Sequence, residues 1–528
     1  MKQDSKIGVV FYASAAFAAA FLIWGAFFTE NLSSVTSATL SFVISSFGWL
    51  YLIATTLFLV FLTYLAFSRF GKIRLGKDDE GPEFSRPSWF AMLFAAGMGT
   101  GLVFWGVAEP ASHLTTPPYG LAESGSADAA ALGMRYSFFH WGFHPWAVYG
   151  TVALALAYFN FRRDGGGLIS STFRPLLGDR VDGPIGKSID ILGIIATLFG
   201  VAVSLGFGAL QVNGGLNFLF DVPNNAGVQI IIIAIITVLF MISAMTGIGR
   251  GIRYLSNLNM ILAAFLVLFI FILGPTVFII DTFTQMVGDY AGALVPMSFS
   301  QNVFESDGTW AANWTLFYWA TWIAWAPFVG SFIARISRGR SIREFIVAVL
   351  FVPSLVSFFW FSTLGGTAIR LIRQGSGDAI TTAVGNNVAV ALFAMLDELP
   401  LSLLTSLTAI FLVSVFFITS ADSASFVLAS MTTGGALNPP TYVKLIWGAV
   451  ISSFAGVLLL AGGLDALQKV AIIAAVPFAL IMIAMCFSLY KALLKEPKPN
   501  REETPTFDHL KEQVKEKVSG QSSTGSQG

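Results

Sequence analysis

The sequence has very little of three things that most proteins of its length use freely. Only 11% of its 528 residues are charged, it has one cysteine, Cys486, and four histidines, and its net charge is +0. One cysteine excludes an intrachain disulfide framework or a cysteine metal cluster, and the neutral balance argues against a nucleic-acid partner. A zinc or copper site on His140 and His144, spaced i, i+4, would lack further ligands, because His113 is expected in a loop and His509 in the tail.

Hydrophobic residues make up 55% of the chain instead, and the mean hydropathy is +0.73. Such a composition is typical of a polytopic membrane protein. Apolar runs of roughly 20 residues, the length that crosses hydrocarbon as a helix, recur from end to end. They predict an all-α fold with about twelve transmembrane helices, near residues 7–28, 46–68, 87–107, 136–160, 188–219, 226–248, 254–280, 312–334, 343–366, 401–430, 441–462 and 467–491.

Basic residues mark one side of these spans. They gather in the short loops after the second, fourth, sixth and eighth spans, whereas residues 109–134 and 281–311 contain no Lys or Arg. Because short basic loops stay in the cytoplasm, both termini are expected there as well. Lys2 and Lys6 precede the first run as they would in a signal peptide, but the run is long enough to span the membrane, which favours an uncleaved first helix.

Three segments fit this pattern less simply. Arg370 and Arg373 fall in a loop expected on the outer side, so residues 366–400 are predicted to contain a short re-entrant or interfacial segment. Residues 281–298 are shorter and more polar than a span, and they predict an amphipathic helix along the outer surface. In the C-terminal tail, residues 507–518 could form a helix near anionic lipid, although a solvated tail fits the composition as well.

The most distinctive local feature is a set of three tryptophans at three-residue spacing, Trp319, Trp322 and Trp325. Along one side of a helix, their rings would present negative π-faces to a cavity. A cation without hydrogen-bond donors, such as a quaternary ammonium, suits such a wall. The same residues would also fit an interfacial aromatic belt or plain packing, and the residues alone leave these alternatives open.

Residues 97–101 place three glycines at alternate positions inside the third span. Glycine is costly in a helix, and unwound backbone at membrane depth is tolerated only where it lines a cavity inside the protein. Transporters build midplane sites in this way. Close helix packing by small residues is the alternative, but no strong helix former separates these glycines, which favours unwinding.

Polar residues interrupt the tenth span at Thr419, Ser420 and Asp422. Hard oxygen atoms at this density suit a small alkali cation. An intramembrane carboxylate marks a functional or structural network, although Asp422 could instead cap a helix or pair with a cytoplasmic arginine.

The fourth span combines aromatic residues with a proline. Pro145 is expected to kink the helix and to free a carbonyl near Trp141. Trp141 and Tyr149 lie two turns apart, about 80° around the axis, so both could face one cavity.

Together these segments resemble the betaine/choline/carnitine transporter family. The resemblance extends over nearly the whole chain and is carried by residues 97–101, 104–110, 140–149, 319–328, 334–345 and 418–423. It implies a multi-pass protein of the bacterial cytoplasmic membrane with a LeuT-like core, in which two inverted five-helix repeats follow two extra helices, and commonly a homotrimer.

With this resemblance, the chain would divide into five parts. These are an N-terminal tail with two peripheral transmembrane helices (1–85), the first five-helix repeat (86–280), the outer amphipathic helix and its loop (281–311), the second repeat (312–494) and a cytoplasmic tail (495–528).

The resemblance also implies a site. The family's aromatic box falls on Trp141, Trp146, Tyr149 and Trp322, with Trp325 lining the path, and its sodium site falls on the backbone of Ala95, Met98 and Phe416 and the hydroxyls of Thr419 and Ser420. The family's sodium-independent exchangers lack this hydroxyl pair, so its presence implies sodium coupling. A second sodium site is in doubt, because the fifth span offers Ser204 but no threonine in 201–211. Thr321 stands where many members have a tryptophan.

The net charge of the candidate substrates limits which of them the site would favour. A net cation such as choline should need an acidic partner, and the family's proton-coupled choline transporters place an Asp where this chain has Gly101. A zwitterion brings its own carboxylate, which a bound sodium ion and the unwound backbone of Met98, Gly99, Thr100 and Gly101 could hold. We therefore expect a sodium symporter that imports glycine betaine as an osmoprotectant by alternating access. Ectoine, proline betaine, dimethylsulfoniopropionate and carnitine are the alternatives, with choline last.

Other classes of function fit less well. An ion channel would show a repeated filter or an acidic ring, and an enzyme would need a nucleophile–base pair or a metal constellation. A structural scaffold would leave the motifs unexplained. No organic cofactor is expected, only Na⁺ as the coupling ion.

Overall fold

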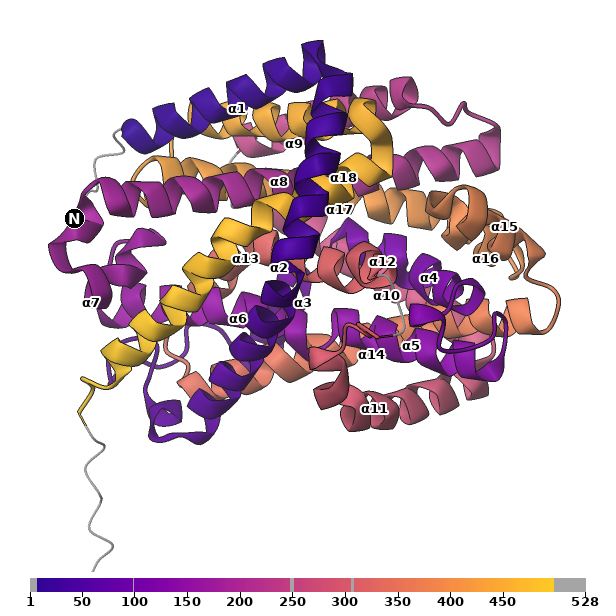
Figure 1. The fold of residues 1–528 in the computed structure, drawn as a ribbon, viewed down its shortest axis with the longest axis horizontal. Coiled ribbons are helices and arrows are strands. Elements are labelled where there is room, and N and C mark those ends of the chain that lie inside the picture. The colour runs from indigo at the N-terminus through magenta and orange to yellow at the C-terminus, as the bar shows by residue number, and fades with distance from the viewer. Residues whose placement is uncertain (1–6, 98, 247–250, 305–307, 498–528) are drawn as a thin grey trace, which may run out of the picture.

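The described part of the chain consists of α-helices joined by loops (Figure 1). The computed structural model describes residues 7–97, 99–246, 251–304 and 308–497. Within these ranges, nine helical segments are long and apolar enough to cross a membrane, which confirms an all-α polytopic membrane protein. They are α1 (Val9–Phe27), α2 (Thr29–Phe67), α8 (Pro184–Phe220), α9 (Ala226–Thr246), α10 (Gly251–Leu273), α12 to α13 (Thr309–Ile336, of which α13 is Phe317–Ile336), α14 (Ile342–Arg373), α17 (Ser402–Thr432) and α18 (Thr441–Leu493).

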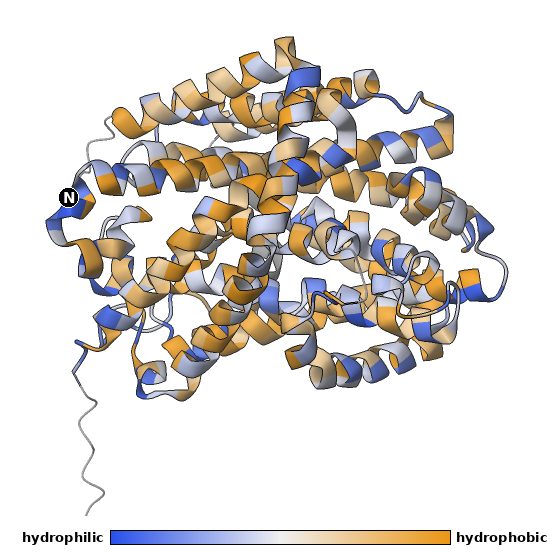
Figure 2. Ribbon diagram, viewed as in Figure 1, coloured by the Kyte–Doolittle hydropathy of each residue, from blue (hydrophilic) through white to orange (hydrophobic). Residues whose placement is uncertain are grey.

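Burial separates central helices from peripheral ones. Apolar residues cover most of each long helix, and polar residues gather at helix ends and in loops (Figure 2). In its most apolar stretch, the segment Thr309–Ile336 is 89% buried and α8 is 83% buried, against 28% for α1 and for α10. Since α1 and α10 leave most of their apolar side chains uncovered, we infer that they face lipid. The centre is formed where α13 packs on α6 (Phe143–Ala157), and where α18 packs on α8 and crosses α2 (Figure 1).

The third predicted span is two helices rather than one. Helix α3 (Arg86–Gly97) ends inside the glycine segment, and α4 (Thr100–Thr115) begins after Gly99, whose backbone is extended with φ −128° and ψ −162°. The unwinding predicted from the three glycines is therefore confirmed. The last carbonyls of α3 and the first N–H groups of α4 have no partner within their own helix, so they are available to ligands or side chains.

The fourth predicted span is broken as well, but not at its proline. Helix α5 (Ala127–Trp141) and α6 (Phe143–Ala157) meet at Gly142, and Pro145 lies in the first turn of α6. Proline is tolerated there because the first N–H groups of a helix have no intrahelical acceptor. A Cβ on Gly142 would lie 2.6 Å from the carbonyl oxygen of Phe138 and 2.8 Å from the hydroxyl of Tyr290, so the close packing requires glycine.

A third interruption falls inside α18. Gly462 and Gly463 have non-helical backbone angles, with φ 161° and φ 60°. This break separates the two spans predicted at 441–462 and 467–491. Twelve membrane crossings, the inverted LeuT-like repeats, the domain boundaries, the homotrimer and the cytoplasmic location of the termini stay predictions.

Helix boundaries differ from the predicted ones at several places. Helix α2 is longer than the run at 46–68, because it starts directly after a bend at Phe28. Helix α11 (Thr276–Phe299) begins before residue 281 and buries one face, as an amphipathic helix does. His113 was expected in a loop and lies inside α4, fully buried. The tail segment 507–518 lies outside the described residues.

The region 366–400 contains short helices, as predicted for a re-entrant or interfacial segment. Helix α14 continues to Arg373, and α15 (Asp378–Asn386) and α16 (Ala391–Asp397) follow. Helices α15 and α16 pack against each other and against α4. The two arginines therefore belong to the end of α14 rather than to a loop.

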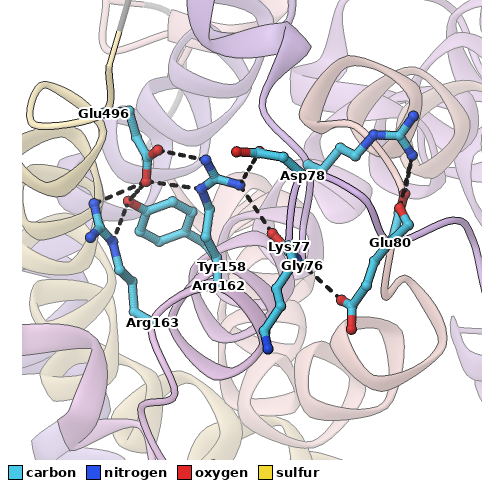
Figure 3. A network of polar contacts seen from close by, with 10 residues as sticks. Gly76, Lys77, Asp78, Glu80, Tyr158, Arg162, Arg163 and Glu496 are labelled. Atoms are coloured by element: carbon cyan, nitrogen blue, oxygen red, sulfur yellow. Dashed lines mark hydrogen bonds and ion pairs between the residues drawn. The ribbon is translucent and has the colours of Figure 1, made fainter.

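Charged residues from several predicted cytoplasmic loops meet in one network (Figure 3). Glu496, just after α18, accepts hydrogen bonds from Arg162 at 2.8 and 3.0 Å, from Arg163 at 2.9 Å and from the hydroxyl of Tyr158 at 2.7 Å. Arg162 also donates to Asp78 in the loop after α2, at 2.7 Å. The network therefore ties the end of α18 to the end of the fourth span and to the second loop.

The charge of Glu496 depends on these arginines. Burial by itself raises the pKa of the Glu496 carboxyl, but the hydrogen bonds from Arg162 and Tyr158 and the positive charges of Arg162 and Arg163 outweigh it, so the pKa lies below its usual range. A carboxyl whose folded pKa is lowered stabilises the fold above its unfolded pKa, and the contribution is lost as the pH falls through the folded value.

We expect Glu496→Gln to lower the free energy of unfolding by roughly 1 to 3 kcal/mol at neutral pH, because two arginines lose a charged acceptor. The difference in Tm from wild type, measured in detergent, should be largest at neutral pH and should become smaller at acidic pH. The control is Asp182→Asn. Asp182 pairs with Arg174 at 2.8 Å, but the two side chains are 65% and 50% exposed, so we expect a change within about 0.5 kcal/mol. Equal changes in Tm for both variants would show that burial of the Glu496 network adds nothing to the stability of the fold.

Candidate functional site

A cavity lies beside the break between α3 and α4. The space inside it, counted together with the part that is open to solvent, is about 410 Å³. Four helices supply its walls: α4, the end of α5, the middle of α8 and the first half of α13. The lining residues are Gly99, Gly101, Leu102, Trp105, Trp141, Val203, Ser204, Phe207, Phe317, Tyr318, Thr321, Trp322 and Trp325.

The face of α13 toward the cavity follows the helical period. Phe317, Tyr318, Thr321, Trp322 and Trp325 all line it, at spacings of one, three and four residues. The predicted tryptophan stripe is therefore correct for Trp322 and Trp325 but wrong for Trp319. Steps of three residues rotate by about 60° each, so the stripe turns away from the cavity.

The ring of Trp319 has a structural role. It stacks on His144, with ring centroids 5.2 Å apart and an interplanar angle of 18°. Tyr318, which the sequence reasoning missed, takes its place in the wall. The sequence could have indicated Tyr318, because it lies four residues before Trp322 and the two rings therefore share one face of the helix.

The four predicted box residues form one contiguous cluster. Ring centroids are 4.9 Å apart for Trp141 and Trp322, 6.0 Å for Trp322 and Tyr149, and 5.7 Å for Tyr149 and Trp146. Only Trp141 and Trp322 line the cavity, and the other two lie beyond Trp322. The hydroxyl of Tyr149 is buried and has no hydrogen-bond partner among the described residues, so a polar group next to it would be stabilised.

Hydrogen bonds hold the tryptophan rings by their polar edges. The Nε1 of Trp322 donates to the carbonyl of His140 at 3.0 Å, and the Nε1 of Trp325 donates to the carbonyl of Gly200 at 2.6 Å. His140 belongs to the last turn of α5, just before the break at Gly142. The break thus frees a carbonyl next to Trp141, as predicted, and Trp322 uses it.

The glycine segment supplies backbone to the wall of the cavity. Gly99 and Gly101 line it, whereas the Thr100 side chain is buried and donates to the carbonyl of Ser204 at 2.9 Å. The hydroxyls of Thr100 and Ser204 are also 2.9 Å apart. Met98 lies outside the described residues.

The predicted sodium ligands come from two helices. Phe416, Thr419 and Ser420 belong to α17, and Ala95 belongs to the last turns of α3. Helix α17 reaches the start of α4, because a Cβ on Gly208 would lie 2.8 Å from Phe417 and 3.2 Å from Thr100.

Two polar residues of the tenth span have partners on neighbouring helices. The hydroxyl oxygen of Thr419 accepts a hydrogen bond from Nδ2 of Asn259, on α10, at 3.0 Å. The carboxylate of Asp422 accepts from the hydroxyl of Ser243, on α9, at 2.7 Å. Asp422 therefore joins a network between helices and does not cap a helix end.

A fully buried carboxylate that the sequence reasoning missed lies next to the cavity. Glu109 accepts hydrogen bonds from Nε1 of Trp141 at 2.9 Å, from the hydroxyl of Tyr318 at 2.5 Å and from Nδ1 of His140 at 2.6 Å. The predicted third span ended at residue 107, which left Glu109 in a loop. The sequence could have indicated it, because Glu109 follows the cavity residues Leu102 and Trp105 by seven and four residues and therefore lies on the same side of the helix.

The two histidines of the fourth span do not share a ligand. His140 bonds to Glu109, whereas Nε2 of His144 lies 3.0 Å from the hydroxyl of Ser298. Glu109, His113 and His140 place one ligand atom each within 4.8 Å of one another. Because the Glu109 oxygens already accept three hydrogen bonds, a hydrogen-bonded cluster accounts for this group.

Comparison with known proteins shows which family the chain belongs to. The model of the betaine/carnitine/choline family of transporters matches residues 9–498. The chain belongs to this transporter family. It is 51% identical to the glycine betaine transporter OpuD of Bacillus subtilis, over 93% of this chain and 95% of that protein. It is 45% identical to a probable glycine betaine transporter of Desulfitobacterium hafniense, over 93% and 99%, and 44% identical to the ectoine/hydroxyectoine transporter of Virgibacillus pantothenticus, over 94% and 99%.

Membership makes the protein a bacterial-type membrane transporter of osmolytes and not an enzyme. The cavity agrees with this function, because seven of its thirteen lining residues belong to the motifs that carry the family resemblance: Gly99, Gly101, Trp105, Trp141, Thr321, Trp322 and Trp325.

We expect Gly200→Ala in this transporter to destabilise the fold by about 1 to 3 kcal/mol, because a methyl group would overpack the contact between α8 and α13. A Cβ there would lie 2.7 Å from Trp325 and 2.9 Å from the backbone of Ala324. The control is Gly456→Ala in α18, where no heavy atom lies within 4 Å and alanine should stabilise the helix by about 0.5 to 1 kcal/mol. Thermal unfolding in detergent measures both; a Gly200→Ala protein as stable as wild type would contradict the tight contact.

Proposed function

We propose that this transporter imports a zwitterionic quaternary-ammonium osmolyte, glycine betaine first, by sodium symport and alternating access. The observation that supports the proposal most directly is the cavity whose aromatic wall faces the unwound point of a helix. One end of the cavity suits a methylated cation, and the other suits a carboxylate.

The aromatic end suits a cation that has no hydrogen-bond donors. Trp105, Trp141, Tyr318, Trp322 and Trp325 offer rings to the cavity, and none of the thirteen lining residues is charged. A trimethylammonium group carries its charge on methyl groups, so it loses little hydration and gains contacts with π-faces. A net cation would find no carboxylate in the wall, whereas a zwitterion is neutral overall.

The glycine end suits a carboxylate. The first N–H groups of α4 have no partner within the helix, and the N-terminus of a helix is a favourable place for an anion. Gly99 and Gly101 carry no side chain, which lets a carboxylate approach the backbone closely.

Sodium coupling is proposed from the oxygens at the same break. The hydroxyls of Thr419 and Ser420, on a helix that packs beside the start of α4, are hard ligands of the kind that Na⁺ prefers. The free carbonyls at the end of α3, including that of Ala95, would complete such a site, and discontinuous helices are used in this way by other transporters.

Ectoine is the second candidate substrate. Thr321 lines the cavity, and a hydroxyl there suits a zwitterion that has N–H donors. One of the relatives, 44% identical, is named an ectoine/hydroxyectoine transporter.

Uptake of labelled glycine betaine into proteoliposomes tests the proposal. We expect accumulation above the external concentration with an inward sodium gradient, and only slow equilibration without it. Competition with unlabelled ectoine and choline then ranks the substrates. Uptake of neither betaine nor ectoine, or sodium-independent accumulation, would contradict the proposal.

Thr419→Ala combined with Ser420→Ala should abolish the stimulation of uptake by sodium, because the ion would lose two hydroxyl ligands. A matched control on the same helix is Thr408→Ala with Ser414→Ala, whose hydroxyls donate to backbone carbonyls one turn back at 2.8 Å. The control should keep the wild-type dependence on sodium. If the Thr419/Ser420 variant keeps it too, the ion binds elsewhere.

Trp322→Leu should raise the apparent KM for betaine by about 10- to 100-fold, because a desolvated cation–π contact is worth about 2 kcal/mol or more. Trp322→Phe keeps an aromatic face and should give a smaller increase. Trp447→Leu serves as the control for losing a buried indole, since Trp447 bonds to Thr432 away from the cavity. A KM for Trp322→Leu equal to that of wild type would show that this ring is only packing.

A further inference from the structure

Glu109 lies directly behind the aromatic wall of the cavity. Its side chain is fully buried in α4, yet Glu109 itself is not a lining residue. Two of its three hydrogen-bond donors, Trp141 and Tyr318, do line the cavity. The rings come from α5 and α13, so one carboxylate holds cavity residues of two different helices.

The partners of Glu109 are those of an ionised carboxylate. An ionised carboxylate only accepts hydrogen bonds, and Glu109 faces an indole N–H, a phenol O–H and a ring nitrogen of His140. The other ring nitrogen of His140 lies 2.9 Å from the hydroxyl of Thr315, which can donate to it. Nδ1 of His140 therefore carries the hydrogen of its bond to Glu109. The cluster is an ionised carboxylate held by three donors.

His113 does not change this assignment. Its Nε2 lies 3.5 Å from a Glu109 oxygen, and neither of its nitrogens has a hydrogen bond among the described residues. A neutral His113 between the rings of Trp310 and Trp314 needs no counter-charge. Among the described residues, Glu109 therefore pairs with no lysine or arginine.

This cluster also holds the third ring of the wall. Trp322 donates to the backbone carbonyl of His140, whose side chain bonds to Glu109. Trp141, Tyr318 and Trp322 contact one another, with centroids 4.9 to 5.9 Å apart. The position of all three rings therefore depends on Glu109 and His140.

We propose that Glu109 is a positioning residue that determines specificity for a cationic headgroup. The inference rests on the proposed function and deepens it. The carboxylate fixes Trp141 and Tyr318 by their polar edges and shifts electron density into both rings through charge-assisted hydrogen bonds. Its own charge acts on the cavity through protein of low dielectric, where screening is weak. A headgroup that carries positive charge is thereby favoured over a neutral group of the same shape.

A pair of ligands with the same shape separates this role from simple packing. Glycine betaine and 3,3-dimethylbutanoate share the carboxylate and three methyl groups, but a neutral carbon replaces the quaternary nitrogen in the second compound. Their affinities for the full-length protein, by calorimetry or by competition with labelled betaine, give a ratio that reports the headgroup charge alone.

We expect Glu109→Gln to weaken betaine by about tenfold or more and to change the affinity of 3,3-dimethylbutanoate much less, so that the ratio collapses. Glu109→Asp keeps the charge and should keep more of the ratio than Glu109→Gln. The control for losing a buried carboxylate is Asp190→Asn, because Asp190 bonds to Ser170 away from the cavity. It should leave the ratio as in wild type.

A second variant tests the role of Glu109 if Glu109→Gln does not fold. Tyr318→Phe keeps the ring and the carboxylate but removes the hydrogen bond between them, and it should weaken betaine several-fold with little effect on the neutral analogue. If either variant lowers the affinities for betaine and for 3,3-dimethylbutanoate alike, or changes neither affinity, Glu109 is only a structural residue and the inference is overturned. If wild type binds no betaine, the proposed function fails and this inference fails with it.

Discussion

The structure depends on one constraint, which is that every backbone polar group inside a membrane must find a partner within the protein. Helices satisfy it automatically, so a break is costly unless something uses the freed groups. This chain breaks two neighbouring spans, at Gly99 and at Gly142. The breaks lie side by side, since a Cβ on Gly101 would lie 3.4 Å from Trp141, the residue that precedes Gly142. The cavity forms where these two interruptions meet.

The freed groups are used by the aromatic wall and, in our proposal, by the transported solute. The carbonyl of His140 is released by the break at Gly142 and accepts the indole N–H of Trp322. Trp325 also donates to a backbone carbonyl, that of Gly200, which lies within the continuous helix α8. Large rings have few rotatable bonds, and a hydrogen bond at the polar edge removes most of the remaining freedom. The wall is therefore formed before any ligand arrives, which lowers the entropic cost of binding.

Two buried carboxylates, Glu496 and Glu109, have different surroundings and different consequences for the protein. At the predicted cytoplasmic side, Glu496 and its arginines form a network that water and salt can reach at its edge, through the exposed Asp78. In the interior of the protein, Glu109 has no exposure at all and accepts hydrogen bonds from Trp141, Tyr318 and His140. The first network stabilises contacts between segments that are distant in sequence, whereas the second acts on the cavity, because weak screening lets a buried charge influence its surroundings.

The sequence by itself determined the membrane class, the helical fold, the break at the glycines and the family, because hydropathy, glycine spacing and motifs are local properties of a chain. It also placed Trp141, Trp322 and Trp325 at a cavity. Only the tertiary structure decided that Tyr318 and not Trp319 completes the wall, that the fourth span breaks at Gly142 and not at Pro145, and that Glu109 and His113 are buried. Each of these depends on which side of a helix meets which neighbour. A rotation of 60° per three residues changes that side while leaving the local pattern the same, and α4 continues to Thr115, eight residues past the predicted end of its span at 107.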